Sequence, residues 1–176
     1  FIYQKTADKM KESILEYLWD DKNKTFRRGL VISKEGVVSN DDTADASSFY
    51  GIMKFGILPI YDKRLILAVE YISNKLECRT KIGGLARYEG DEYYQISKTL
   101  PGNPWIVTTH WYVQFLIFKA EKESDLDEVK KWFNWVVERG LLSGILPEQV
   151  NPLTGGQLSA TPLVWSHTEF VSTVIS

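Results

Sequence analysis

The chain has a single cysteine and only two histidines among its 176 residues. The lone cysteine, Cys78, excludes an internal disulfide framework and is typical of a small buried side chain. His110 and His167 form no HxxxH pattern and no Cys/His cluster, so the sequence predicts neither a metal site nor a cofactor. We expect His110 to be a core histidine with its hydrogen bonds satisfied, and we assign His167 no role.

Neither sign of charge dominates the chain, and long apolar runs are missing. The formal net charge is −2, so no basic field points to a nucleic-acid partner. No uninterrupted apolar stretch could span a bilayer, which argues against a membrane partner. No signal peptide is visible, but the chain begins with Phe1 rather than Met, so the compartment stays open, with the cytoplasm preferred to secretion.

Aromatic residues, in contrast, are abundant, at 13% with six Trp and nine Tyr. Such residues serve either a well-packed core or a sugar site, where flat rings stack on pyranose faces while carboxylates and Arg bind the hydroxyls. Composition alone favours the core.

Hydrophobic periodicity predicts an all-α chain. The predicted helices cover residues 6–20, 44–55, 63–76, 104–122, 125–139 and 165–175, with a short hairpin over 25–38. Half-exposed and buried helices alternate along the chain, and the connections leading into the buried ones are long. This alternation predicts an inner and an outer layer of helices, joined as αα-hairpins, with all long loops at the N-terminal end of the inner helices. Small residues in helix 44–55 suggest that neighbouring backbones approach it closely.

Helix boundaries carry their own signals. The run Asn-Asp-Asp-Thr at 40–43 predicts the start of helix 44–55. Asp62 is predicted to cap helix 63–76, and Asn103 to cap a helix whose first residue is Pro104. Ser124 and Asp127 read as a capping box.

One polar stretch, residues 144–170, has the character of a pocket rim. It presents Glu148 after Pro147 on a Gly/Asn/Pro/Thr loop that is closely bracketed by apolar and aromatic residues. A polar loop of this kind lies on the surface, where function usually resides. The loop at 151–156 lacks the acidic ligands of a calcium site.

Three motifs carry a resemblance to a known family. LPEQ at 146–149 followed by PLVWSH at 162–167 resembles the C-terminal catalytic segment of glycoside hydrolase family 15, which contains glucoamylases, glucodextranases and related trehalases. ARYEGD at 86–91 followed by GNPW at 102–105 is similar to a second signature of that family, and DASS at 45–48 is a weaker third match.

The resemblance implies a fold and a set of site residues. The fold would be an all-α (α/α)6 toroid, about half of it present here. Glu148 would be the general base of an inverting exo-acting hydrolase that releases glucose from α-linked gluco-oligosaccharides or disaccharides. Its partner acid would stand roughly 6.5–9.5 Å away. Substrate would be bound by Arg87, Tyr88, Asp91, Trp105 and Trp165.

Plainer interpretations exist for the same residues. Arg87 could simply pair with Asp91 or Glu89 on the surface, and both tryptophans could belong to the core. No segment here resembles the family's general acid, and we do not promote Asp45, Asp91 or Glu92 to that role. Residues 1–176 are therefore expected to be the C-terminal portion of a longer catalytic domain, partnered by its remainder and inactive alone. A trehalase of the same family and a non-catalytic glucan-binding or regulatory toroid are the two alternatives.

Overall fold

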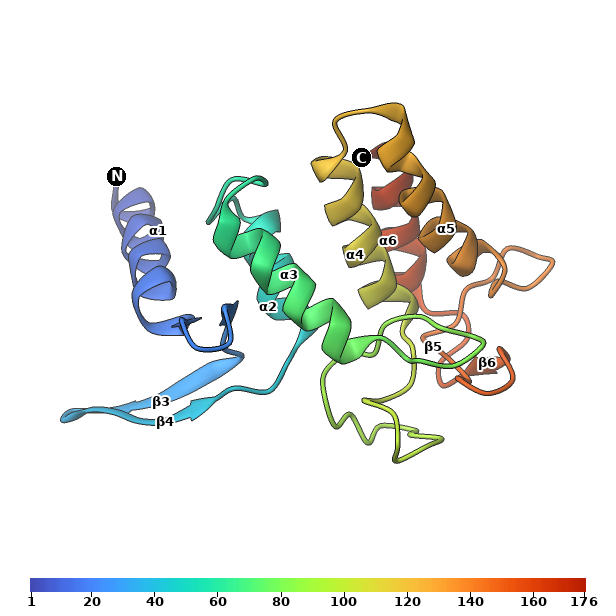
Figure 1. The fold of residues 1–176 in the computed structure, drawn as a ribbon, viewed down its shortest axis with the longest axis horizontal. Helices are drawn as coiled ribbons and strands as arrows, with labels where there is room; N and C mark the ends of the chain where they lie inside the picture. Colours follow the sequence, from blue (N-terminus) through green and yellow to red (C-terminus); the bar gives the residue numbers. More distant parts are fainter.

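The computed structural model describes residues 1–176, and six α-helices dominate it (Figure 1). The α-helices are α1 (Ile2–Ser13), α2 (Ala46–Lys54), α3 (Lys63–Leu76), α4 (Ile106–Lys119), α5 (Leu126–Val137) and α6 (Val164–Ile175). A π-helical turn, Ile14–Leu18, follows α1, and a 3-10 turn, Glu123–Asp125, precedes α5. Three antiparallel strand pairs complete the chain: β1 (Trp19–Asp20) with β2 (Thr25–Phe26), β3 (Gly29–Ser33) with β4 (Gly36–Asp41), and β5 (Gln149–Val150) with β6 (Gln157–Leu158).

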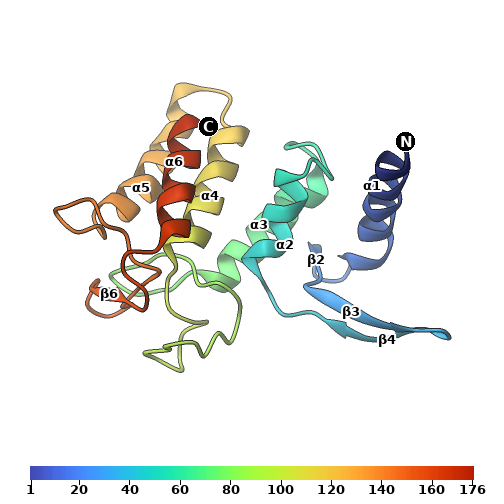
Figure 2. The same cartoon turned by 180° about the vertical axis from the view of Figure 1, so that it is seen from behind.

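The helices form two layers, as the alternation of exposure predicted. Helix α4 packs against α2 on one side and α6 on the other, and these three make the inner row. Helix α3 packs on α2, and α5 packs on α4. Short connections follow α2 and α4 at one end, whereas the long loops gather at the opposite end, where α2, α4 and α6 begin (Figures 1 and 2).

Local signals predicted α3 well and the start of α4 poorly. Asp62 caps α3 as expected, because its Oδ1 accepts the Arg64 N–H at 2.9 Å. Helix α4 begins at Ile106 with Trp105 as its N-cap, so the predicted Asn103 cap and Pro104 first turn are wrong. The Asn103 side chain instead donates to the Gln149 side chain at 2.8 Å and thereby ties two loops together.

The other capping predictions also shift. The helix-start signal at 40–43 lies ahead of the true cap of α2, Asp45, whose Oδ1 accepts the Ser47 N–H at 2.8 Å. The proposed Ser124–Asp127 box is wrong, since Asp125 Oδ2 accepts the Lys122 N–H at 3.3 Å and starts the 3-10 turn. In both cases the cap is another residue of the same polar segment, because several side chains there can accept the free N–H groups at the start of a helix.

Helix α1 is more exposed than the sequence predicted, since the apolar stripe Met10, Ile14, Leu15 and Leu18 is typical of a half-exposed helix. None of its residues is buried, and Met10 is 60% exposed. The remainder of the stripe, Ile14, Leu15 and Leu18, lies in the π-helical turn and packs against the main core. The predicted hairpin over 25–38 is present as β3 and β4, which project from the body of the molecule (Figure 1).

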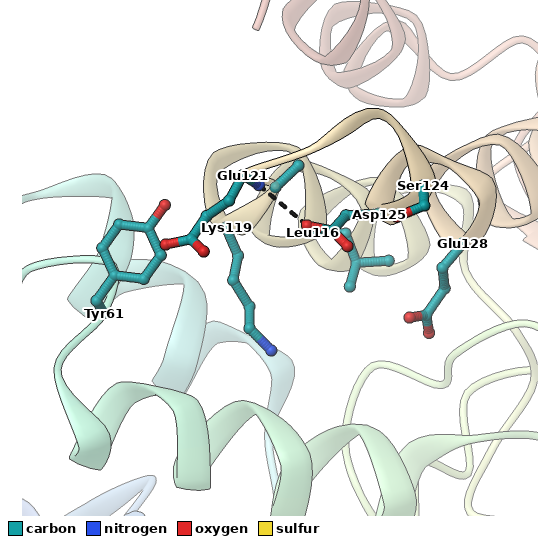
Figure 3. Close-up of a pocket in the computed structure, with 8 residues that line it drawn as sticks. Tyr61, Leu116, Lys119, Glu121, Ser124, Asp125 and Glu128 are labelled. Carbon is teal, nitrogen blue, oxygen red and sulfur yellow. Dashed lines mark hydrogen bonds between the residues drawn. The ribbon is translucent and has the colours of Figure 1, made fainter.

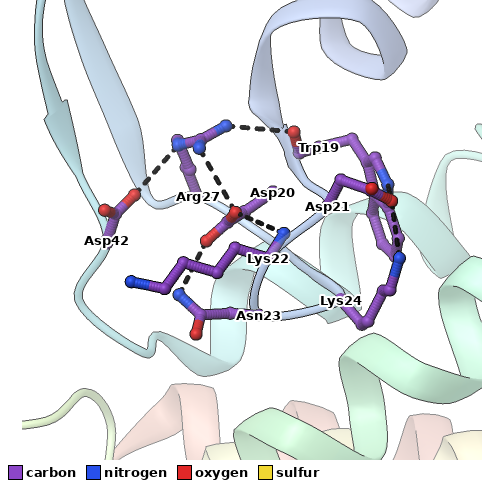
Figure 4. A network of polar contacts seen from close by, with 8 residues as sticks. All are labelled: Trp19, Asp20, Asp21, Lys22, Asn23, Lys24, Arg27 and Asp42. Atoms are coloured by element: carbon purple, nitrogen blue, oxygen red, sulfur yellow. Dashed lines mark hydrogen bonds and ion pairs between the residues drawn. The ribbon is translucent and has the colours of Figure 1, made fainter.

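A polar network fixes the base of that hairpin (Figure 4). Arg27 donates from Nε to Asp42 Oδ1 at 2.9 Å and from Nη1 to the Trp19 carbonyl at 3.0 Å, and its Nη2 lies 3.4 Å from Asp20 Oδ1. Burial acts to raise the pKa of Asp20, but its hydrogen bonds from Asn23 and the Lys22 N–H, with the charge of Arg27, hold that pKa below its ordinary value. Asp20 is therefore an ionised anchor between β1 and the approach to α2.

The inner helices differ in how completely they are covered. Helix α4 is buried as predicted, from Ile106 to Phe115, with only Tyr112 half-buried. On α2, no atom lies within 4 Å of a Cβ built at Gly51, so the expected close approach of a neighbouring backbone is absent there. Helix α6 was expected to be buried, yet only Ser166 and Thr173 are, because α4 is its single neighbour in the row.

Cys78 and His110 are both buried in the interior. Cys78 is fully buried, which confirms the prediction of a small buried side chain, and this burial raises the pKa of its thiol to about 12. His110 is fully buried beside Phe133 and Phe170, as predicted, but neither ring nitrogen has a hydrogen-bond partner in the protein. None of the helices combines the length and apolar character that crossing a membrane requires.

Candidate functional site

The three sequence motifs meet at the N-terminal ends of the inner helices. Isolated antiparallel bridges join Asp45 to Tyr88, Ala86 to Pro104, and Trp105 to Gln149. These bridges connect the segments ahead of α2, α4 and α6 through backbone hydrogen bonds. Residues far apart in the sequence are therefore held in one continuous layer.

Arg87 and Asp91 form a two-pronged ion pair within this layer. Arg87 Nε donates to Asp91 Oδ2 and Arg87 Nη2 donates to Asp91 Oδ1, each at 3.0 Å. The Asp91 side chain is 1% exposed and also accepts the Tyr93 N–H at 3.1 Å. The Arg87 side chain is 34% exposed, so the pair joins a partly exposed cation to a buried carboxylate.

Aromatic rings surround the same guanidinium. Its carbon lies 4.4 Å from the ring centre of Trp105, 4.8 Å from that of Tyr88 and 5.7 Å from that of Tyr93. Trp105 is only 2% exposed, so it supports Arg87 from the core side. A cation packed on rings in this way is restricted in direction as well as in position.

Glu148 is half-buried, and its main chain is fixed on both sides. Its N–H donates to the Ala160 carbonyl at 2.9 Å, and its C=O accepts from the Ile106 N–H at 3.2 Å. The Ser159 hydroxyl donates to Glu148 Oε2. The carboxylate of this partly buried residue is therefore oriented by a neighbouring loop residue.

The first turn of α6 holds the two residues that precede Glu148. The Ser166 hydroxyl donates to the Pro147 carbonyl at 2.7 Å, and the Leu146 N–H donates to His167 Nε2 at 3.2 Å. The Leu146 carbonyl accepts the Leu163 N–H at 3.1 Å. His167, which we assigned no role from the sequence, thus contacts the LPEQ segment directly.

A second network, which sequence reasoning missed, connects the three inner helices below Trp165. Glu169 Oε2 accepts from Gln114 Nε2 at 2.9 Å and from the Tyr50 hydroxyl at 3.4 Å, and its Oε1 accepts from Trp165 Nε1 at 3.3 Å. Burial, and after it the charge of Glu169, raises the pKa of Tyr50 to about 12. The i,i+4 spacing of Trp165 and Glu169 was the one signal in the sequence that could have indicated the hydrogen bond between these two side chains.

The aromatic wall continues across the inner row. Tyr50 stacks on Trp111 with ring centres 4.4 Å apart, and Trp111 lies 5.7 Å from Trp165. Trp165 is 46% exposed, unlike Trp105. The two tryptophans predicted to bind substrate therefore differ, one lying at the surface and the other beneath Arg87.

A cleft of about 430 Å³ lies away from this layer, between the α2–α3 and α4–α5 connections (Figure 3). Glu121, Asp125 and Glu128 line it. The cleft lies beside the C-terminal end of α4 and Glu148 beside its N-terminal end. A helix of this length spans about 20 Å at about 1.5 Å per residue, so these carboxylates are too distant to act with Glu148. No group of three or more His, Cys, Asp or Glu side chains is arranged to hold a metal ion.

The fold and the layer of motifs define a helical toroid of the glucoamylase type. A bacterial glucoamylase complexed with acarbose superimposes with a TM-score of 0.76 over 98% of this chain, at 22% identity. A glucoamylase from Saccharomycopsis fibuligera matches with a TM-score of 0.67 over 98% of the chain, at 15% identity. These likenesses confirm the family-15-like fold that the motifs implied.

A relative in sequence points to the same class. An uncharacterized glycosyl hydrolase of Methanocaldococcus jannaschii is 34% identical over 140 residues, which are 74% of this chain. The chain spans 21% of that relative, 28% of the bacterial glucoamylase and 48% of the Saccharomycopsis enzyme. A comparison with models of known protein families finds no match.

Proposed function

We propose that the chain is part of the catalytic domain of an inverting, exo-acting glycoside hydrolase that releases glucose from α-linked gluco-oligosaccharides. The observation that carries this proposal is the backbone layer that brings Glu148, Arg87 and Trp105 to one end of the inner helices. The glucoamylases with this fold, one of them described with acarbose, support the substrate class.

Glu148 acts as the general base in this proposal. A base must be ionised and must reach a water molecule on the face of the anomeric carbon opposite the leaving group. The half-buried carboxylate of Glu148, directed by the Ser159 hydroxyl, suits that role. The protonated partner would come from a segment outside residues 1–176, and the chain alone would then be inactive.

Arg87 binds sugar hydroxyls with the donors that Asp91 leaves free. A guanidinium has five N–H donors, and Asp91 occupies two of them. The other three donors are available to a substrate in this proposal, since the Arg87 side chain is 34% exposed. Asp91 is buried, so we assign it the role of holding Arg87 rather than touching substrate, while Trp105 supports Arg87 and Trp165 offers an exposed ring for stacking.

The test is Glu148→Gln in the longer protein that carries this chain, with maltose, isomaltose and trehalose assayed side by side. We expect kcat to fall by at least about 10³-fold and the wild type to release glucose as the inverted anomer, which NMR detects. Glu138→Gln, an exposed carboxylate at the end of α5, is the matched control and should leave kcat unchanged.

The outcomes separate the alternatives. Activity on trehalose alone would replace the glucoamylase proposal with the trehalase one, and no release from any of the three sugars would favour a glucan-binding domain. Unchanged hydrolysis by Glu148→Gln would remove Glu148 as base. Glucose release by residues 1–176 alone at enzymatic rates would overturn the proposal that the acid lies elsewhere.

A further inference from the structure

The backbone around Glu148 is held by two kinds of hydrogen bond. The N–H and C=O of Glu148 itself bind other backbone groups, so these bonds do not depend on any side chain. The Pro147 carbonyl and the Leu146 N–H are held by side chains, those of Ser166 and His167. Both contacts come from adjacent residues of α6, and Leu146 and Ser166 are buried.

We propose that Ser166 and His167 are positioning residues that set the direction of the Glu148 carboxylate, an inference that rests on the proposed role of Glu148 as base. Pro147 has a fixed φ, and the Ser166 hydroxyl holds its carbonyl. The peptide plane that leads into Glu148 therefore has little freedom to rotate. A displacement of about 1 Å at a reacting group can cost 100-fold in rate. The pair therefore acts on the chemistry through two peptide groups and without touching substrate.

The contact requires one particular form of the His167 ring. Nε2 accepts the Leu146 N–H, so Nε2 carries no proton and Nδ1 carries the single proton of the neutral ring. An imidazolium has no acceptor. A glutamine offers an amide oxygen at a similar distance from Cα, whereas a leucine fills space and offers no acceptor.

The first experiment uses the longer protein that carries this chain and does not depend on activity. Nitrogen NMR should report His167 in the Nδ1–H form, and the Leu146 amide should exchange slowly with solvent. We expect His167→Leu to accelerate exchange of that amide at least about 10-fold and His167→Gln to keep it within about threefold of wild type. Unchanged exchange in His167→Leu, or a protonated Nε2, would overturn the inference.

The second experiment measures steady-state kinetics in the longer protein. His167→Leu and Ser166→Ala should lower kcat by about 10- to 100-fold with KM within about twofold, and His167→Gln should restore most of kcat. Thr168→Ala, an exposed neighbour on α6, should match wild type. Parallel losses of kcat and melting temperature in both His167 variants would indicate a merely structural role and sink the proposal.

The two proposals fail separately. If Glu148→Gln hydrolyses substrate normally, the proposed function fails whatever His167 does. If Glu148→Gln is inactive but His167→Leu keeps the wild-type kcat, the base stands and the positioning role is wrong.

Discussion

Arg87 and Asp91 meet through two parallel hydrogen bonds of 3.0 Å, one from Nε and one from Nη2. Asp91→Asn removes the charge of a buried partner, so Arg87 loses its fixed direction. We expect KM to rise about 10-fold or more in the longer protein. We also expect the free energy of unfolding of residues 1–176 to fall by about 2 kcal/mol, less than for a fully buried pair because Arg87 is partly exposed.

Glu89 supplies the matched control for that experiment. Its carboxylate pairs with Lys75 at 3.3 Å, and both side chains are 45% exposed. An exposed pair of this kind contributes little to stability, so Glu89→Gln should change the free energy of unfolding by less than about 0.5 kcal/mol. Equal effects of the two substitutions in urea titrations would contradict the special role of the Arg87–Asp91 pair.

Ser159 should affect the rate rather than the fold. Its hydroxyl donates to Glu148 Oε2 from a loop. Ser159→Ala removes this hydrogen bond, which orients the Glu148 carboxylate, without creating a large cavity. We expect kcat to fall by about 10-fold with little change in KM or melting temperature. Wild-type kcat in the alanine variant would exclude a role for the contact.

His110 should make the native state sensitive to mild acid. Burial lowers its pKa to about 4, whereas the unfolded chain has the ordinary value of about 6.5. Between these values the unfolded state binds a proton that the native state does not, so stability is full above pH 6.5 and declines as the pH falls toward 4.

We expect the free energy of unfolding to fall by about 2 kcal/mol from pH 7 to pH 5 through this residue. Urea titrations at both pH values measure the loss. His110→Leu should lack this component, and an equal pH dependence in wild type and variant would show that other groups cause it.

Gly84 is expected to tolerate no side chain. Its φ is +91°, and a Cβ there would lie 2.6 Å from Pro104 Cβ and overlap the ring of Trp135. Gly84→Ala should cost about 3 kcal/mol through strain and overpacking together. Gly90 is the control, because its φ is +80° but no atom lies within 4 Å of a Cβ built there. Gly90→Ala should therefore lower the free energy of unfolding by about 1 kcal/mol, through backbone strain alone. Similar melting temperatures for the two variants would refute the packing argument.

Local chemistry was sufficient for the elements whose causes lie within a few residues. Helix α3 has the predicted bounds because Asp62 and its apolar stripe act within one segment. The layered order of helices also followed from periodicity and loop length. Asn103 shows the limit, because its side chain binds Gln149, 46 positions away, and so could not serve as the helix cap that its sequence context suggested.

The candidate site was predictable in part for the same reason. The motifs predicted which segments would form the candidate site, and the bridges between them place these segments together. The contacts of Glu169 with Tyr50 and Gln114 depend on three helices packing side by side, which no local pattern encodes. The exposure of α6 likewise depends on how many neighbours it has, not on its own composition.

Trp165, Ser166 and His167 are consecutive residues of one helical turn, so each points about 100° away from the last. Trp165 presents its exposed ring, Ser166 binds the Pro147 carbonyl, and His167 binds the Leu146 N–H. Inserting or deleting a single residue just before Val164 would rotate all three out of phase together. This junction should therefore accept many substitutions during evolution while its length stays constant.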